Sequence, residues 1–149
     1  MWIASTATAQ LLEVGADGTL VSSVPLEGRQ PSDVVQAADS TLWFIDAERL
    51  ELVQVAPDGA LLTALPLVPF TSLESPHLAL DGNALWITHP EESALLLVDV
   101  TTGSFIDERI DLTRPDGTRL GKAVGIAISP EGQLWVTDSL GAAVVLVNP

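Results

Sequence analysis

Four tryptophans recur along the chain at intervals of 41, 43 and 49 residues, and the residues around them recur as well. Each tryptophan follows Leu or Met and precedes an apolar residue, and the third residue after it is polar. The four copies are Met1–Ser5, Leu42–Asp46, Leu85–His89 and Leu134–Asp138. A period of about 40–45 residues indicates a repeat architecture and constrains the fold more than any other feature of the sequence.

Each copy continues with further short apolar runs. A second run covers Gln10–Val14, Leu50–Val55, Ala94–Val100 and Ala142–Val147; a third covers Thr19–Leu26, Ala60–Leu67 and Ser104–Leu112; and a fourth leads into the next tryptophan at Asp33–Ala37, His77–Leu80 and Val124–Ile128. Asp-Gly turns such as Asp17-Gly18 and Asp58-Gly59 join several of them, which is typical of hairpins. Four strands per repeat predict an all-β fold, the β-propeller. A β-sandwich or a simple meander is the alternative, and the shared tryptophan position favours the propeller.

If the strands of a blade are called a to d, the tryptophan lies on strand b. The chain then contains about three and a half four-stranded blades in one partial propeller domain, 1–149, with fourteen strands in the order b-c-d, a-b-c-d, a-b-c-d, a-b-c. The blade remnants are 1–26, 31–67, 75–112 and 123–149. A partial ring exposes a blade face and strand edges at each end, and such surfaces favour association. We interpret the polar insertion 113–122 as a surface loop rather than a binding loop.

The composition limits the partners. The formal net charge is −14, with 6 basic and 20 acidic residues. Because this charge repels phosphate groups, we expect no nucleic-acid partner and no membrane partner, and a cation is the more natural small ligand. No apolar run approaches the roughly 18–20 residues of a membrane helix. Without cysteine, disulfides and thiolate zinc sites are excluded. The first residues have no signal-peptide features, and the compartment stays open.

The segment Ala123–Asp138 resembles the blade signature of the streptogramin-lyase-like (virginiamycin B lyase) propellers, and it is similar to NHL-repeat and gluconolactonase-like blades. Ser75-Pro76-His77 resembles the entry to strand a in the lyase group, although Leu78 stands where that group has Gly. The resemblance implies a ring of six or seven blades. It also implies a metal-assisted elimination that opens a cyclic ester, with a histidine as the base. His77 matches by context, whereas His89 stands where the family more often has a carboxylate.

Four polar residues are candidate site residues because propeller topology directs the ends of strands b and the starts of strands a to one rim. They are Asp46, His89, Asp138 and His77. Carboxylates and imidazoles could hold a divalent metal, Ca²⁺ or Mg²⁺, and His77 or His89 could act as a base. Alternatively, Asp46 and Asp138 cap strand ends and the histidines are ordinary rim residues. The chain has no nucleophile elbow, phosphate loop or paired-histidine metal motif.

Three functions remain at this stage. The first is a non-catalytic partial propeller that associates with itself, as a homodimer or another closed homo-oligomer, and presents a ligand-binding rim without a required cofactor. The second is a metal-dependent lyase or lactonase. The third is an NHL-like module that recognises a protein or glycan. The first is favoured because no complete catalytic set is visible, and whether the chain is an enzyme stays open.

Overall fold

The computed structural model describes residues 1–67, 76–114 and 116–147, and within them every regular element is a β-strand. The strands are β1 (Trp2–Ser5), β2 (Gln10–Val14), β3 (Leu20–Pro25), β4 (Pro31–Gln36), β5 (Leu42–Asp46), β6 (Glu51–Val55), β7 (Leu61–Pro66), β8 (Leu78–Asp81), β9 (Ala84–His89), β10 (Ala94–Asp99), β11 (Ser104–Asp111), β12 (Ala123–Ile128), β13 (Leu134–Asp138) and β14 (Ala143–Val147). In the part described, no helix has the length and apolar character needed to cross a bilayer.

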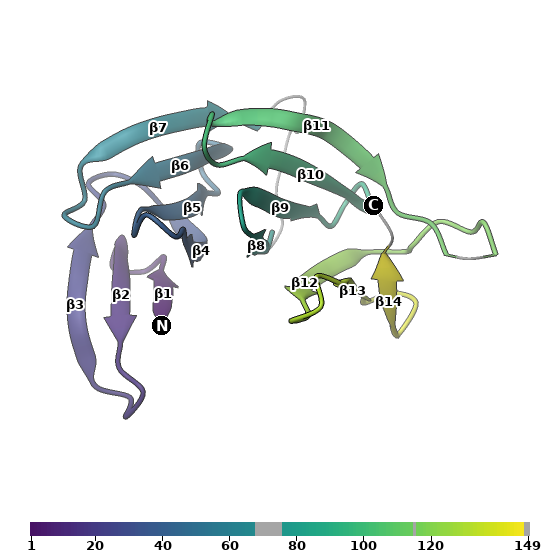
Figure 1. Ribbon diagram of the computed structural model, residues 1–149, viewed down its shortest axis with the longest axis horizontal. Coiled ribbons are helices and arrows are strands. Elements are labelled where there is room, and N and C mark those ends of the chain that lie inside the picture. The colour runs from purple at the N-terminus through teal and green to yellow at the C-terminus, as the bar shows by residue number, and fades with distance from the viewer. Residues whose placement is uncertain (68–75, 115, 148–149) are drawn as a thin grey trace. The chain divides into compact units, whose positions relative to one another are not determined.

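The strands form four antiparallel sheets, each a meander of neighbours along the chain (Figure 1). Sheet 1 is β1-β2-β3, sheet 2 is β4-β5-β6-β7, sheet 3 is β8-β9-β10-β11 and sheet 4 is β12-β13-β14. The described residues therefore contain the fourteen strands and the 3-4-4-3 division that the repeat predicts. The all-β, partial-propeller prediction is confirmed. The predicted start of the third blade, Ser75, lies outside the described residues.

Sheets 1 and 2 belong to one compact unit, Met1–Ser72, and sheets 3 and 4 to a second, Leu73–Pro149. The core of the first unit lies between its two sheets, where Leu11 and Val24 of sheet 1 meet Leu42 and Phe44 of sheet 2. The core of the second unit is built in the same way. There Trp86, Leu95 and Leu112 of sheet 3 and its following linker pack with Leu134 and Val136 of sheet 4. The prediction of one continuous domain stays a prediction.

Several hairpins and loops are closed by the same local device. An Asp side chain accepts hydrogen bonds from both the backbone N–H and the hydroxyl of the Thr two residues later, and this arrangement fixes the turn. The four pairs are Asp17–Thr19, Asp39–Thr41, Asp99–Thr101 and Asp116–Thr118. In two of these turns the residue directly after the Asp is a Gly with φ near +80°, a backbone conformation that residues with a side chain disfavour. These turns explain why Asp recurs between the apolar runs.

The shared position of the four tryptophans in the repeat favours a core location for each, but they do not all lie in the core. Trp43 and Trp86 are buried, and Trp2 packs against the core of its unit. Trp135 is 37% exposed. The face of sheet 4 that carries Trp135 is opposite the face that packs on sheet 3, and no further sheet of the second unit covers it within the described residues.

Candidate functional site

The predicted strand-end residues occupy one equivalent position in all four sheets, and each caps the turn that follows. Ser5, Asp46, His89 and Asp138 end β1, β5, β9 and β13. Each makes a hydrogen bond to the residue three positions later, through Ser5 Oγ–Thr8 Oγ1 (2.6 Å), Arg49 N–Asp46 Oδ1 (3.3 Å), Glu92 N–His89 Nδ1 (3.0 Å) and Gly141 N–Asp138 Oδ1 (2.9 Å). The cap holds a tight turn that ends in a left-handed residue, with φ of +46° to +54° at Ala9, Leu50, Ser93 and Ala142.

Asp46 is fully buried, and its two oxygens are engaged on several sides. Oδ2 accepts from Arg29 Nη1 at 3.3 Å and from Arg49 Nη1 at 3.2 Å. Oδ1 accepts from the backbone N–H of Gln30 at 3.4 Å, in addition to the turn N–H. A buried carboxylate is tolerated only when it is paired and hydrogen-bonded in this way. Asp46 therefore joins the linker between sheets 1 and 2 to the turn after β5.

Asp138 repeats this arrangement in the second unit. Its oxygens accept the backbone N–H groups of Gly121 (3.0 Å) and Lys122 (3.1 Å), and Arg114 pairs with Oδ2. Burial alone would raise the pKa of Asp138, but the N–H groups of Gly141, Gly121 and Lys122, together with the Arg114 guanidinium, hold it below its usual value. Arg114 belongs to the insertion 113–122, so its ion pair with Asp138 ties this insertion to sheet 4. Arg29 makes the equivalent ion pair with Asp46 in sheet 2.

His89 takes the carboxylate position in sheet 3, where the preceding linker, 68–76, contains no Lys or Arg. Its side chain is buried, and burial lowers its pKa more than the negative charges of Glu92 and Glu91 raise it. Because Nδ1 accepts a hydrogen bond, the neutral ring carries its proton on Nε2. An imidazole can thus replace Asp as the cap where the preceding linker supplies no arginine to pair with a carboxylate.

His77 directly precedes β8 and lies next to Thr88 of β9, the residue before His89. Its carbonyl accepts from the N–H of Thr88 at 3.0 Å, and its own N–H donates to Thr88 Oγ1 at 2.8 Å. No group of three or more His, Asp or Glu side chains is placed to hold a metal within residues 1–67, 76–114 and 116–147. The metal and base roles stay predictions.

The structure reveals an apolar face that residue-by-residue reasoning had not named. On the uncovered side of sheet 4, cross-strand pairs bring Ala127, Trp135 and Leu146 into one row and Thr137 and Val144 into the next. We call this surface, with Gly125, the Trp135 face. A hollow of about 240 Å³ on it is lined by Gly125, Ile126, Ala127, Trp135, Thr137 and Val144. Among the described residues, no charged side chain lines this hollow.

The equivalents of the Trp135 face are covered inside the chain. Trp2 packs against the core shared with sheet 2, and Trp86 against the core shared with sheet 4. The opposite faces behave in the same way: Phe44 and Val136, each next to a tryptophan, are fully buried against the preceding sheet. Their counterpart in sheet 1, Ile3, is 41% exposed. We call the surface around it the Ile3 face; Met1, Leu12 and Val14 share it by register.

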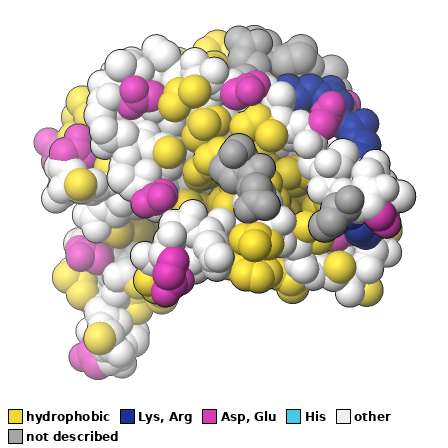
Figure 2. Space-filling view, turned by 45° about the vertical axis from the view of Figure 1, so that its right-hand side comes forward, with side chains coloured by type: hydrophobic (Ala, Val, Ile, Leu, Met, Phe, Trp, Pro, Cys, Tyr) yellow, Lys and Arg dark blue, Asp and Glu magenta, His cyan; other side chains and the backbone are white. Residues whose placement is uncertain are grey.

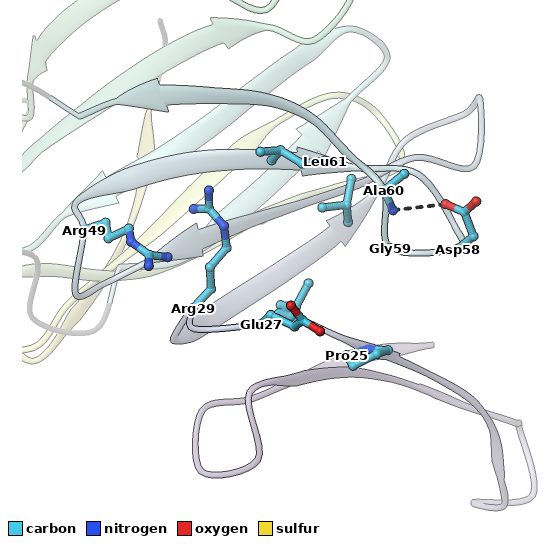
Figure 3. A pocket seen from close by; sticks show the side chains of 10 residues that line it. Pro25, Glu27, Arg29, Arg49, Asp58, Gly59, Ala60 and Leu61 are labelled. Atoms are coloured by element: carbon cyan, nitrogen blue, oxygen red, sulfur yellow. Dashed lines mark hydrogen bonds between the residues drawn. The ribbon is translucent and has the colours of Figure 1, made fainter.

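A second hollow, of about 640 Å³, lies in the first unit between the end of β3 and the start of β7 (Figure 3). Pro25, Leu26, Val55 and Leu61 contribute apolar surface to it. Arg29 and Arg49 line it with their charges already directed at Asp46, and Arg29 also pairs with Glu51 at 2.8 Å. The guanidinium groups are therefore neutralised by the protein, and this hollow is not a strong anion site.

Four of the six basic residues, Arg109, Arg114, Arg119 and Lys122, lie in or beside the insertion. Figure 2 shows Lys and Arg side chains next to acidic ones on the right of the view. Arg109 pairs with Glu92 and Asp111, both at 2.9 Å, and Arg119 pairs with the same Asp111. These exposed pairs order the insertion but contribute little stability each. They support its interpretation as a structural surface loop.

Repeated four-stranded meanders with these shared turns and clamps define a β-propeller. Neither a protein-family model nor a curated protein sequence matches the chain. Among solved structures, virginiamycin B lyase from Staphylococcus aureus is similar over 99% of this chain and 48% of its own length, with a TM-score of 0.75 and 17% identity. A streptogramin B lyase is similar over 99% of this chain and 47% of its own length, with a TM-score of 0.74 and 18% identity. Glutaminyl cyclase from Myxococcus xanthus is similar over 99% of this chain and 69% of its own length, with a TM-score of 0.67 and 18% identity.

The predicted likeness to streptogramin-lyase-like propellers is confirmed, at the level of the fold. The chain spans about half the length of the lyases that it matches.

Proposed function

We propose that this chain is a propeller module that associates with a second copy of itself into a closed ring, whose rim of turns and linkers presents a ligand-binding surface. The observation that carries the proposal is the exposed Trp135 face. In the two junctions within the units, a tryptophan-bearing face packs against the face of the next sheet that carries Phe44 or Val136. The Trp135 face and the Ile3 face are the same two surfaces without their partners.

The two faces complement one another in a head-to-tail sense. With a twofold axis, the Trp135 face of each copy meets the Ile3 face of the other, and both junctions are alike, which closes the ring. Two copies would supply about as much chain as one lyase, of which this chain covers 48%. The charge of −14 on each copy opposes association at low salt. Added salt should therefore strengthen the dimer.

Light scattering coupled to gel filtration at micromolar concentration tests the proposal. We expect twice the mass of the chain, and we expect Trp135→Lys to give the monomer because it places a charge in the junction. Leu140→Lys is the matched control, since Leu140 is 75% exposed in the turn after β13 and should leave the dimer intact. A monomeric wild-type protein, or a Trp135→Lys variant that still forms dimers, would reject the proposal.

A further inference from the structure

The outer strands of sheets 1, 2 and 3 end in a common pattern, an apolar residue, one variable residue and a buried Leu. The three copies are Val24-Pro25-Leu26, Leu65-Pro66-Leu67 and Ile110-Asp111-Leu112. The leucines follow β3, β7 and β11 directly, and their exposed fractions are 4%, 1% and 2%. Each leucine therefore anchors the end of an outer strand in the core of its unit or against the strands beside it.

The backbone of each leucine makes the same bond. Its N–H donates to the carbonyl of the left-handed residue that opens the preceding strand, at 2.8 Å to Ala9, 2.8 Å to Leu50 and 3.1 Å to Ser93. The positive φ turns that carbonyl towards the outer strand. The left-handed residue and the apolar-x-Leu pattern thus form a matched acceptor and donor in three sheets.

Within the described residues, sheet 4 has the acceptor without the donor. Ala142 has φ of +47°, like its three counterparts, and β14 follows it directly. Among the described residues, β14 pairs with β13 alone. In an antiparallel ladder alternate residues direct their N–H and C=O groups to one side. By equivalence with Leu50, Leu52 and Gln54 of sheet 2, the backbone groups of Ala142, Val144 and Leu146 face the open edge.

The surface beside this edge suits an added strand. A hollow of about 320 Å³ is lined by the apolar side chains of Ile110, Leu112, Leu146 and Val147, with Asp111, Thr113 and Arg114. Val144 is 64% exposed. An uninterrupted apolar strand such as Ala143–Val147 is typical of a strand with neighbours on every side rather than of a bare edge.

We propose that the open edge of β14 is a binding site for an extended peptide segment of another polypeptide, one that carries the apolar-x-Leu pattern. The segment adds antiparallel to β14, and the N–H of its Leu donates to the carbonyl of Ala142. Main-chain bonds supply affinity and the apolar side chains supply selectivity, as in other strand additions. Because the chain carries a charge of −14, the segment is neutral or basic. The proposal concerns the backbone edge of β14 and does not depend on the Trp135–Ile3 junction, although Val144 and Leu146 belong to both surfaces.

The chain's own outer strand is the probe. A fluorescent peptide with the sequence of residues 19–26, Thr-Leu-Val-Ser-Ser-Val-Pro-Leu, is titrated with the intact protein and its anisotropy is measured. We expect saturable binding. The same peptide with an N-methyl group on the last Leu loses the bond to Ala142, and we expect its affinity to fall about tenfold, the effect of one lost hydrogen bond. Equal affinity for both peptides, or no binding at millimolar protein, would overturn the proposal.

Two protein variants locate the site. Val144→Pro removes an N–H that faces the open edge, where proline is tolerated, and we expect it to abolish binding. Val144→Thr keeps the N–H and should bind as the wild type does. If Val144→Pro binds the peptide like Val144→Thr, the edge is not the site. Should Val144→Pro not fold, the N-methyl peptide decides alone. A monomeric protein that binds the peptide would reject the ring and leave this proposal standing.

Discussion

At the scale of single residues, one equivalent position in the four sheets has the same capping role but carries three different side-chain types. The residue three places after each tryptophan is Ser, Asp, His or Asp, and in every case it caps the turn to the next strand. The two carboxylates occur where an arginine, Arg29 or Arg114, reaches them from the preceding linker. The position is therefore structural in all four sheets, whatever else its side chains do.

The cap at His89 leads to a pH-dependent stability. Its pKa is lower in the folded protein than in the unfolded chain, where it is about 6.5, because burial disfavours the charged ring. The folded state is therefore undisturbed above about pH 6.5 and loses stability as the pH falls below it, towards the lower pKa of the folded state. His89→Asn keeps an acceptor and does not titrate. We expect urea denaturation between pH 7.5 and 5 to show a smaller loss of stability for this variant than for the wild type.

The control for this experiment is the wild type at pH 7.5, where His89 is neutral in both states and the two proteins should differ least. Equal losses in the two proteins on acidification would show that His89 does not contribute to the pH dependence. The carboxylates with lowered pKa, such as Asp138, titrate at lower pH and affect both proteins alike.

At the scale of the strand and the sheet, the two tryptophans of the second unit should differ in their contribution to folding. Trp86 is 8% exposed and packs with Leu134 and Val136 between sheets 3 and 4. Trp86→Ala leaves a cavity there and should lower the free energy of unfolding by about 3–5 kcal/mol. Trp135→Ala should lower it less, by about 1–2 kcal/mol in the monomer, since Trp135 is 37% exposed.

Urea denaturation of both variants, in a background kept monomeric by Leu146→Lys, measures this difference. If Trp135→Ala costs as much as Trp86→Ala in that background, then the Trp135 face is covered by the chain itself. The assignment of that face as open would then be wrong.

Strand positions followed closely from the sequence because the repeat supplied independent copies of each strand and turn. β2, β5 and β13 begin and end at the residues expected, and no boundary of another strand differs by more than two residues. The faces of the strands could not be assigned in the same way. In Ala143–Val147 every residue is apolar, so alternation gives no sign of which side packs on sheet 3 and which stays open.

At the scale of the whole molecule, the metal prediction can be tested directly. Asp46 and Asp138 already accept from arginines and backbone N–H groups, and a cation would have to displace these donors. We therefore expect millimolar Ca²⁺, Mg²⁺, Mn²⁺ or Zn²⁺ to leave the melting temperature unchanged. Binding to the folded state would raise it by mass action. A rise that His77→Ala/His89→Ala abolishes would instead establish the metal site.

The sequence by itself determined the number of strands, their order in four sheets and the class of fold. These features depend on local periodicity and turn chemistry, and both recur in every copy of the repeat. It also placed Asp46, His89 and Asp138 at equivalent strand ends. What only the tertiary structure decided is how these side chains are used and which surfaces stay open. The arginine clamps and the exposure of Trp135 depend on contacts between residues far apart in the chain, and no local pattern encodes such contacts.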